Sequence, residues 1–103
     1  MKRDMDLIRR ILLQVEKQHN DPNTGFEVRI PGRSEGEVSY HLLLLNQAGL
    51  VKALHLRESN GEERWRVFHL TWQGHDLLDT LRVNSRIKRQ IKTRFQGQNR
   101  AEP

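Results

Sequence analysis

Residues 41–51 read His41-Leu42-Leu43-Leu44-Leu45-Asn46-Gln47-Ala48-Gly49-Leu50-Val51, a pattern typical of a helix that ends just before a strand. Upstream, Ser34-Glu35-Gly36-Glu37 fits a capping box, which predicts a helix from Ser34 to about Ala48. Gly49 suits the position after this helix, because glycine adopts a positive φ without strain. Strands are expected over 50–57 and 64–70, and Asn60-Gly61 between them favours a hairpin turn.

The flanking segments predict three further kinds of element. Apolar residues at three- and four-residue steps indicate a helix over 3–19, which Asp4 or Asp6 would cap. The alternation in Phe26–Ile30 indicates a short strand. Thr71 would cap a helix over 72–82, and Asn84-Ser85 would precede a last helix over 86–95. Trp65 and Trp72 are expected in the core or on the hairpin.

These elements indicate an α+β fold of winged helix-turn-helix type. The order is helix, short strand, recognition-type helix, β-hairpin wing and helix, with a C-terminal basic helix added. We expect a winged-helix domain over 1–82, a basic amphipathic helix over 83–95 and a disordered tail over 96–103. The 103 residues suit a single domain.

The composition excludes several classes of protein. The chain has no cysteine, which rules out disulfides and thiolate metal sites. Its five histidines show no close pair, so no metal is expected. No glycine-rich phosphate loop or nucleophile motif is present, so we expect neither an enzyme nor a cofactor. Without a long apolar run or a signal peptide, the expected location is the cytoplasm and no membrane partner is expected.

Positive charge is concentrated at the C-terminal end. Residues 1–81 hold 11 Lys+Arg and 12 Asp+Glu, whereas residues 82–103 hold 7 Lys+Arg and one Glu. The formal net charge of +5 therefore belongs to the last helix and tail. A basic segment of this kind suits an anionic partner, with double-stranded DNA as the first candidate.

Two motifs resemble known families. His41–Val51 resembles the HLxxLxxAGLV segment that ends the recognition helix of many bacterial winged-helix regulators. Leu70-Thr71-Trp72-Gln73-Gly74-His75-Asp76-Leu77-Leu78-Asp79 is similar to the LTxxGxxxLD segment that follows their wing. With the opening residues 1–13, these stretches resemble an uncharacterised bacterial and prophage-associated family of small winged-helix-like proteins, a domain of unknown function. The resemblance covers residues 1–90 and implies DNA binding only by analogy of fold.

The sequence departs from a full helix-turn-helix before the recognition-type helix. Only Ile30-Pro31-Gly32-Arg33 separates the expected strand from Ser34, which leaves no room for a separate supporting helix. Either that helix is reduced to a turn, or the helix from Ser34 is split near Gly36. Both alternatives change the way in which such a helix docks in a major groove.

The candidate DNA contacts come from three segments. The recognition-type helix offers polar groups on the face opposite Val38, Leu42 and Leu45, although Glu35 and Glu37 at its start would repel phosphates. The hairpin offers arginines that either grip phosphates or pair with Glu58, Glu62 and Glu63. The last helix offers a basic face. The candidates are Ser39, Tyr40, Gln47, Arg57, Arg64, Arg66, Arg86, Lys88, Arg89 and Lys92.

Apolar residues outside the expected core suggest a second hypothesis. Leu43 and Leu44 point outward or sideways from the recognition-type helix, which suits a protein interface better than a wet groove. Val83, Ile87, Ile91 and Phe95 form a stripe on the last helix that would pack within the subunit or across a homodimer. The two hypotheses are a DNA-binding regulator or phage accessory factor, and a winged-helix protein-interaction module without DNA binding.

Overall fold

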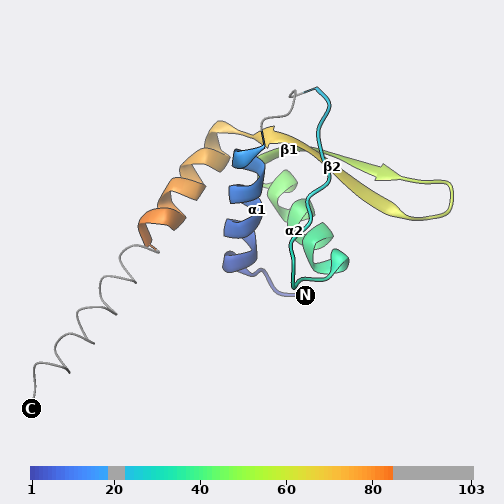
Figure 1. The fold of residues 1–103 in the computed structure, drawn as a ribbon, viewed down its shortest axis with the longest axis horizontal. Coiled ribbons are helices and arrows are strands. Elements are labelled where there is room, and N and C mark those ends of the chain that lie inside the picture. Colours follow the sequence, from blue (N-terminus) through green and yellow to red (C-terminus); the bar gives the residue numbers. More distant parts are fainter. Residues whose placement is uncertain (19–22, 85–103) are drawn as a thin grey trace, which may run out of the picture.

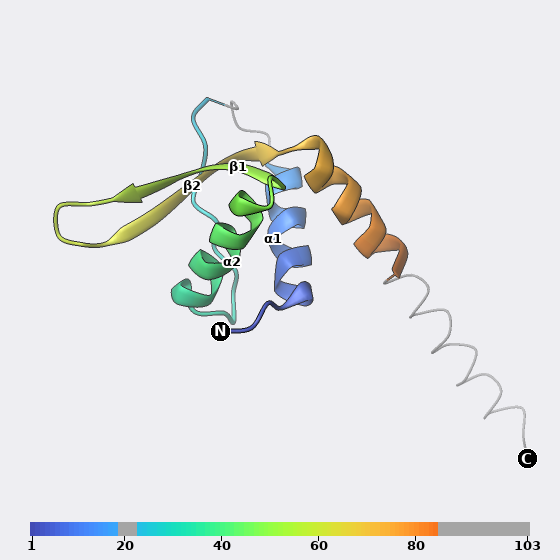
Figure 2. The ribbon, with the colours of Figure 1, turned by 180° about the vertical axis from the view of Figure 1, so that it is seen from behind.

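The computed structural model describes residues 1–18 and 23–84 as a small α+β fold. The order is α1 (Met5–Lys17), α2 (Glu35–Gln47), β1 (Val51–Arg57) and β2 (Glu63–Leu70), followed by a third helix that occupies 72–84 of the described residues. Figures 1 and 2 show α1 beside α2, with the hairpin projecting to one side and the third helix to the other. The α+β class is therefore confirmed.

Helix α1 begins directly after Asp4, one of the two aspartates that the sequence predicts as its cap. Asp4 caps the helix, and its carboxylate accepts hydrogen bonds from the N–H groups of Asp6 and Leu7 at 3.0 and 3.3 Å. The apolar stripe of α1 then faces the core. Its buried side chains are Leu7, Ile8, Ile11, Leu12 and Val15.

The helix α2 begins after Ser34, whose hydroxyl oxygen accepts a hydrogen bond from the N–H of Glu37 at 3.1 Å. It runs without a break through Gly36, and Gly49 follows it with a φ of 71° as expected. Just before it, the N–H of Arg33 donates to the carbonyl of Ile30 at 3.2 Å and closes a turn. The residues described between α1 and α2 therefore contain a turn directly before α2 and no helix.

The expected strand over 26–30 is wrong as an element of secondary structure. Only Phe26 pairs with β2, through one isolated bridge to Val67. The alternation of burial is present, because Val28 and Ile30 are buried while Arg29 is exposed. The hydrogen bonds go elsewhere: the side-chain amide of Gln14 on α1 donates to the carbonyl of Arg29 and accepts from its N–H, at 2.8 and 3.1 Å. The segment is therefore fastened to α1 and leaves β2 after Phe26.

The hairpin and the start of the third helix follow the prediction closely. β1 and β2 pair antiparallel from Val51–Leu70 to Arg57–Glu63, with an irregularity after Lys52. Thr71 accepts a hydrogen bond from the N–H of Gly74 and donates its hydroxyl to the carbonyl of Gly49, so it links the third helix to the end of α2. Trp65 is buried as expected. The expectation for Trp72 is wrong, because this side chain at the start of the helix is 80% exposed.

One core joins these elements. It combines the buried stripe of α1 with apolar side chains of α2, the hairpin, the third helix and the segment from Val28 to Ile30. Within the described residues the third helix continues through Val83 and Asn84, two residues beyond its expected end at 82. The predicted last helix over 86–95 and the tail over 96–103 lie outside the described residues.

Candidate functional site

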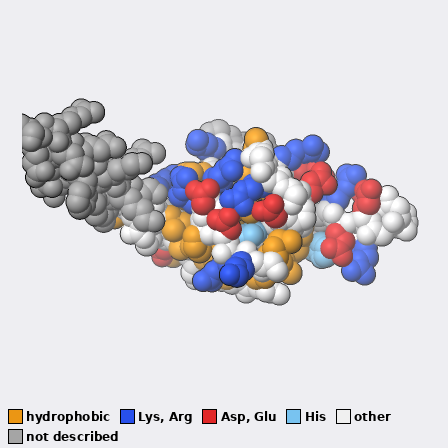
Figure 3. Space-filling model, turned by 90° about the horizontal axis from the view of Figure 1, so that it is seen from below, with side chains coloured by type: hydrophobic (Ala, Val, Ile, Leu, Met, Phe, Trp, Pro, Cys, Tyr) orange, Lys and Arg blue, Asp and Glu red, His pale blue; other side chains and the backbone are white. Residues whose placement is uncertain are grey.

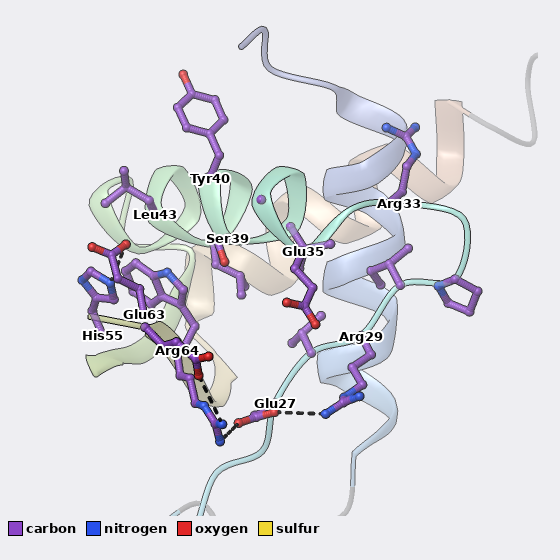
Figure 4. A pocket seen from close by; sticks show the side chains of 18 residues that line it. Glu27, Arg29, Arg33, Glu35, Ser39, Tyr40, Leu43, His55, Glu63 and Arg64 are labelled. Atoms are coloured by element: carbon purple, nitrogen blue, oxygen red, sulfur yellow. Dashed lines mark hydrogen bonds and ion pairs between the residues drawn. The ribbon is translucent and has the colours of Figure 1, made fainter. Parts of the chain in front are cut away.

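A groove of about 1040 Å³ lies between α2, the hairpin and the extended segment that precedes α2 (Figure 4). We call it the α2–hairpin groove. Its walls are the segment 27–31 on one side and residues 62–65 of the hairpin on the other, and α2 forms its floor. The lining residues are Glu27, Val28, Arg29, Ile30, Pro31, Arg33, Glu35, Gly36, Val38, Ser39, Tyr40, Leu42, Leu43, His55, Glu62, Glu63, Arg64 and Trp65.

The groove exists because two segments diverge after one bridge. Phe26 and Val67 exchange two backbone hydrogen bonds, each of 2.9 Å. A regular antiparallel ladder would next place Val28 opposite Trp65. Gln14 instead holds Arg29 against α1, so the segment turns away from β2 at this point. The space that an additional strand would fill remains open.

The wall formed by β2 is a strand edge. Residues of an antiparallel strand alternate between those whose N–H and C=O face the partner strand and those whose groups face away. Val67 bonds Phe26, so its polar groups point away from β1. The paired stretch is regular from Val67 to Glu63, so Trp65 and Glu63 point their N–H and C=O groups in the same direction, toward the groove. The described residues supply no hydrogen-bond partner for these backbone groups or for those of Val28.

The floor and one wall are apolar or aromatic in part. Leu43 on α2 is 37% exposed and lines the groove. The imidazole of His55 stacks on the indole of Trp65, with ring centroids 4.5 Å apart and planes inclined by 10°. In Figure 4, Ser39 lies on the side of α2 toward the ion pairs of the groove, whereas Tyr40 projects in the opposite direction. The groove therefore combines apolar surface with unpaired backbone groups.

The hairpin arginines are all engaged inside the molecule. Arg64 lies within 3.7 Å of carboxylate oxygens from three residues, Glu27, Glu58 and Glu62. Arg57 pairs with Glu63 at 3.0 Å, and Arg66 donates to the carbonyl of Thr24 at 2.8 Å. In the view of Figure 3, acidic and basic side chains are interspersed along the hairpin and the body, without a large area of one sign.

Two carboxylates in the groove have opposite surroundings. The guanidinium of Arg57, together with His55, holds the pKa of the Glu63 carboxyl below its usual value. The carboxylate of Glu35, in the first turn of α2, makes no hydrogen bond or ion pair with the described residues. In Figure 4 its side chain points into the space between the hairpin and the segment 27–31. Glu35 is therefore the carboxylate of the groove that is free to pair with a positively charged group of another molecule.

Arg33 occupies one end of the groove and ties the two helix starts together. Its guanidinium donates to Asp4 at 2.7 Å and to Glu37 at 3.0 Å. These bonds lower the pKa of both carboxyls. His41, one turn further along α2, is buried and accepts a hydrogen bond from the N–H of Asp4 at 2.9 Å. Arg33 is consequently satisfied and unavailable to a partner.

The structure brings some of the candidate residues together and separates others. Ser39, Leu43 and Arg64 line the groove. Tyr40 also belongs to the lining, although its ring projects away from the ion pairs (Figure 4). Gln47 and Leu44 lie further along α2 and outside the groove. Arg57 and Arg66 are on the hairpin but do not line the groove, and Val83 is exposed on the third helix. The other candidates lie outside the described residues: Arg86, Ile87, Lys88, Arg89, Ile91, Lys92 and Phe95.

The backbone part of the groove could not be predicted from the sequence. It consists of the unpaired N–H and C=O groups of Val28, Glu63 and Trp65. These groups are unpaired because the segment after Phe26 leaves β2, and no residue type in the sequence indicates where this happens. His55 was also missed, although its place opposite Trp65 follows once the hairpin register is known. Within residues 1–18 and 23–84, no cluster of metal-ligating side chains occurs, and no helix has the length and apolar character needed to cross a bilayer.

Comparison with known proteins identifies the family. Residues 2–98 match the family model described as a hypothetical protein, DUF2513. An uncharacterised protein of Haemophilus influenzae is 38% identical over 99 residues, which cover 96% of this chain and 82% of that protein. No solved structure matches the chain. The chain therefore belongs to the DUF2513 family of hypothetical proteins.

Proposed function

We propose that this chain is a small protein-interaction module that binds a partner protein in the α2–hairpin groove. The observation that carries the proposal is the groove itself, which joins an exposed leucine, a stacked aromatic pair and unpaired strand edges. Apolar surface and free backbone groups together suit a polypeptide, which offers both kinds of contact.

We further propose that the architecture is a winged-helix variant, in which α2 and the hairpin correspond to recognition helix and wing.

The charges favour a protein over a nucleic acid at this surface. A phosphate backbone is held by free lysine and arginine side chains. α2 carries neither, and Glu35 stands at its start. Arg64 in the wall would have to leave three glutamates before it could bind phosphate. These features disfavour binding of DNA through the groove.

A photo-crosslinker placed at Leu43 tests the proposal. The chain with p-benzoylphenylalanine at position 43 is irradiated in cells that naturally carry it, and crosslinked peptides are identified by mass spectrometry. A matched variant carries the same group at Asp79, whose side chain is 70% exposed on the third helix. We expect one partner protein to crosslink at position 43 and not at 79. Equal labelling at both positions, or none, would overturn the proposal.

DNA binding is a second candidate, favoured by a specific observation. Residues 82–103 hold 7 Lys+Arg and one Glu, a segment suited to phosphate contacts that do not depend on base sequence. In this alternative the chain is a regulator or phage accessory factor, with a homodimer formed through the C-terminal stripe. Titration of a labelled duplex at low salt compares the full chain with a variant whose Arg86, Lys88, Arg89 and Lys92 are changed to glutamine. If this alternative is correct, the four glutamine changes abolish binding of the duplex, whereas Arg64→Gln leaves the binding unchanged.

A further inference from the structure

We infer that the partner enters the α2–hairpin groove as an extended segment, adds to the free edge of β2 as a strand, and places a lysine or arginine beside Glu35. This inference rests on the proposed function and specifies its mode of recognition. Strand addition is a general way for a sheet edge to recognise a peptide. Three features of the groove lead to it.

The first feature is the interrupted ladder. The edge of β2 already bonds one extended residue, Phe26, through Val67. The same edge continues with Trp65 and Glu63, whose backbone groups point into the groove without partners among the described residues. A strand of the partner that lies along this edge, next to Phe26, would bond these groups in the register that the Phe26–Val67 bridge establishes. An α-helix cannot do so, because its own N–H and C=O groups are already bonded within it.

The second feature is the opposite wall. Val28 turns its side chain into the core, with 9% exposure, while its backbone groups have no partner among the described residues. An unpaired edge is a template for a further strand. The incoming segment therefore meets edge groups from two directions, one set from β2 and one from residue 28. This arrangement favours an extended backbone over a folded surface.

The third feature is the charge. The groove is lined by four glutamates and by three arginines, which are Arg29, Arg33 and Arg64. Each arginine lies within 4 Å of a glutamate or aspartate oxygen of this chain. Glu35 alone among the glutamates has no such partner in the part of the chain that the structure describes. Charge complementarity therefore assigns a basic side chain to the occupant, next to apolar side chains that cover Leu43.

A matched pair of variants at Glu63 isolates the backbone contact. Glu63→Ala and Glu63→Pro both remove the carboxylate that binds Arg57 and His55. Only proline also removes the N–H that faces the groove. The ladder to β1 is unaffected, because this N–H points away from β1. Circular dichroism and thermal unfolding establish that both variants are folded.

The probe is a fluorescein-labelled octapeptide of alternating lysine and valine, and its binding is followed by anisotropy. We expect Glu63→Pro to bind it about tenfold more weakly than Glu63→Ala, because one groove hydrogen bond is lost. Glu35→Gln is expected to weaken binding about threefold at low salt. The corresponding peptide of glutamate and valine should not bind. If Glu63→Pro is unfolded, two N-methylated peptides test the same hydrogen bonds from the ligand side. One peptide is methylated on its odd residues and the other on its even residues. We expect one of the two methylation patterns to abolish binding.

Three results would overturn strand addition. These are equal affinities of Glu63→Pro and Glu63→Ala, equal affinities of the two N-methylated peptides and the parent, and no binding of the lysine–valine peptide up to about 1 mM. If a partner still crosslinks at position 43, it docks by another mode, for example as a helix, and the proposed function stands. If position 43 also fails to crosslink, the proposed function falls together with the inference.

Discussion

The guanidinium of Arg33 donates a hydrogen bond of 2.7 Å to the carboxylate of Asp4, the residue that caps α1. The same group donates to Glu37 in the first turn of α2. One arginine in the turn before α2 thus fixes the starts of both helices, although 29 positions separate it from Asp4. The floor of the α2–hairpin groove is positioned by this contact.

Acid should destabilise the fold through this cluster. A carboxyl whose pKa is lowered by folding stabilises the folded state above its unfolded pKa, and this contribution is lost as the pH falls through the folded value. Arg33 lowers the pKa of Asp4 from 3.8 and that of Glu37 from 4.5. Urea unfolding between about pH 5 and pH 2 should show a steep loss of stability in the wild type and a shallower one in Arg33→Met. Arg29→Met, which removes an exposed arginine, should keep the wild-type slope.

His41 should be required for stability rather than for binding. The N–H of Asp4 donates to Nε2 of His41, so the proton is on Nδ1, which donates to the carbonyl of Glu37 at 2.7 Å. His41→Leu places an apolar side chain of similar size at this buried position and leaves the N–H of Asp4 without its acceptor. We expect a loss of about 1–3 kcal/mol in the free energy of unfolding, measured with urea. His75→Gln, on an exposed histidine, should change it by less than about 0.5 kcal/mol.

Two glycines in helices should respond to alanine with opposite signs. A Cβ on Gly74 would lie 2.0 Å from the carbonyl oxygen of Leu50, so Gly74→Ala forces the third helix away from the end of α2. We expect a destabilisation of about 1–3 kcal/mol. A Cβ on Gly36 would meet only the hydroxyl of Ser34, at 4.0 Å, and Gly36→Ala should stabilise α2 by about 0.5–1 kcal/mol. Thermal unfolding of the two variants checks both signs, and a shared sign would contradict the packing described for Gly74.

Hydrogen exchange should alternate along β2. The N–H groups of Arg64 and Arg66 face β1 and that of Val67 bonds Phe26, so these three amides are expected to exchange slowly. The amides of Glu63 and Trp65 should exchange fast, although the indole of Trp65 is buried. Residue-resolved exchange by NMR measures the pattern in the free protein. Slow exchange at both Glu63 and Trp65 would show that the edge is already paired.

The features that sequence reasoning predicted depend on neighbouring residues. The cap at Ser34, the left-handed Gly49 and the hairpin between β1 and β2 each follow from groups within a few positions. The groove is different, because the link from Gln14 to Arg29 joins residues 15 positions apart. Alternation in 26–30 predicted correctly which side chains are buried, but burial alone does not decide which backbone a strand bonds. Trp72 shows the same limit, since an aromatic side chain is buried only if another element packs over it.

The position of the free edge also bears on whether two molecules of this chain can pair through their sheets. An exposed strand edge ordinarily recruits the edge of another molecule, and repeated pairing leads to aggregates. Here the unpaired backbone groups of Trp65 lie in the groove, beside the segment 27–31 and α2, whereas Glu63 lies on the exposed outer part of the hairpin. A lone chain can reach them, but the sheet of a second molecule meets the walls first. The groove therefore admits a single extended chain and hinders pairing with the sheet edge of a second molecule. The unpaired N–H and C=O groups of β2 then do not lead to a larger sheet.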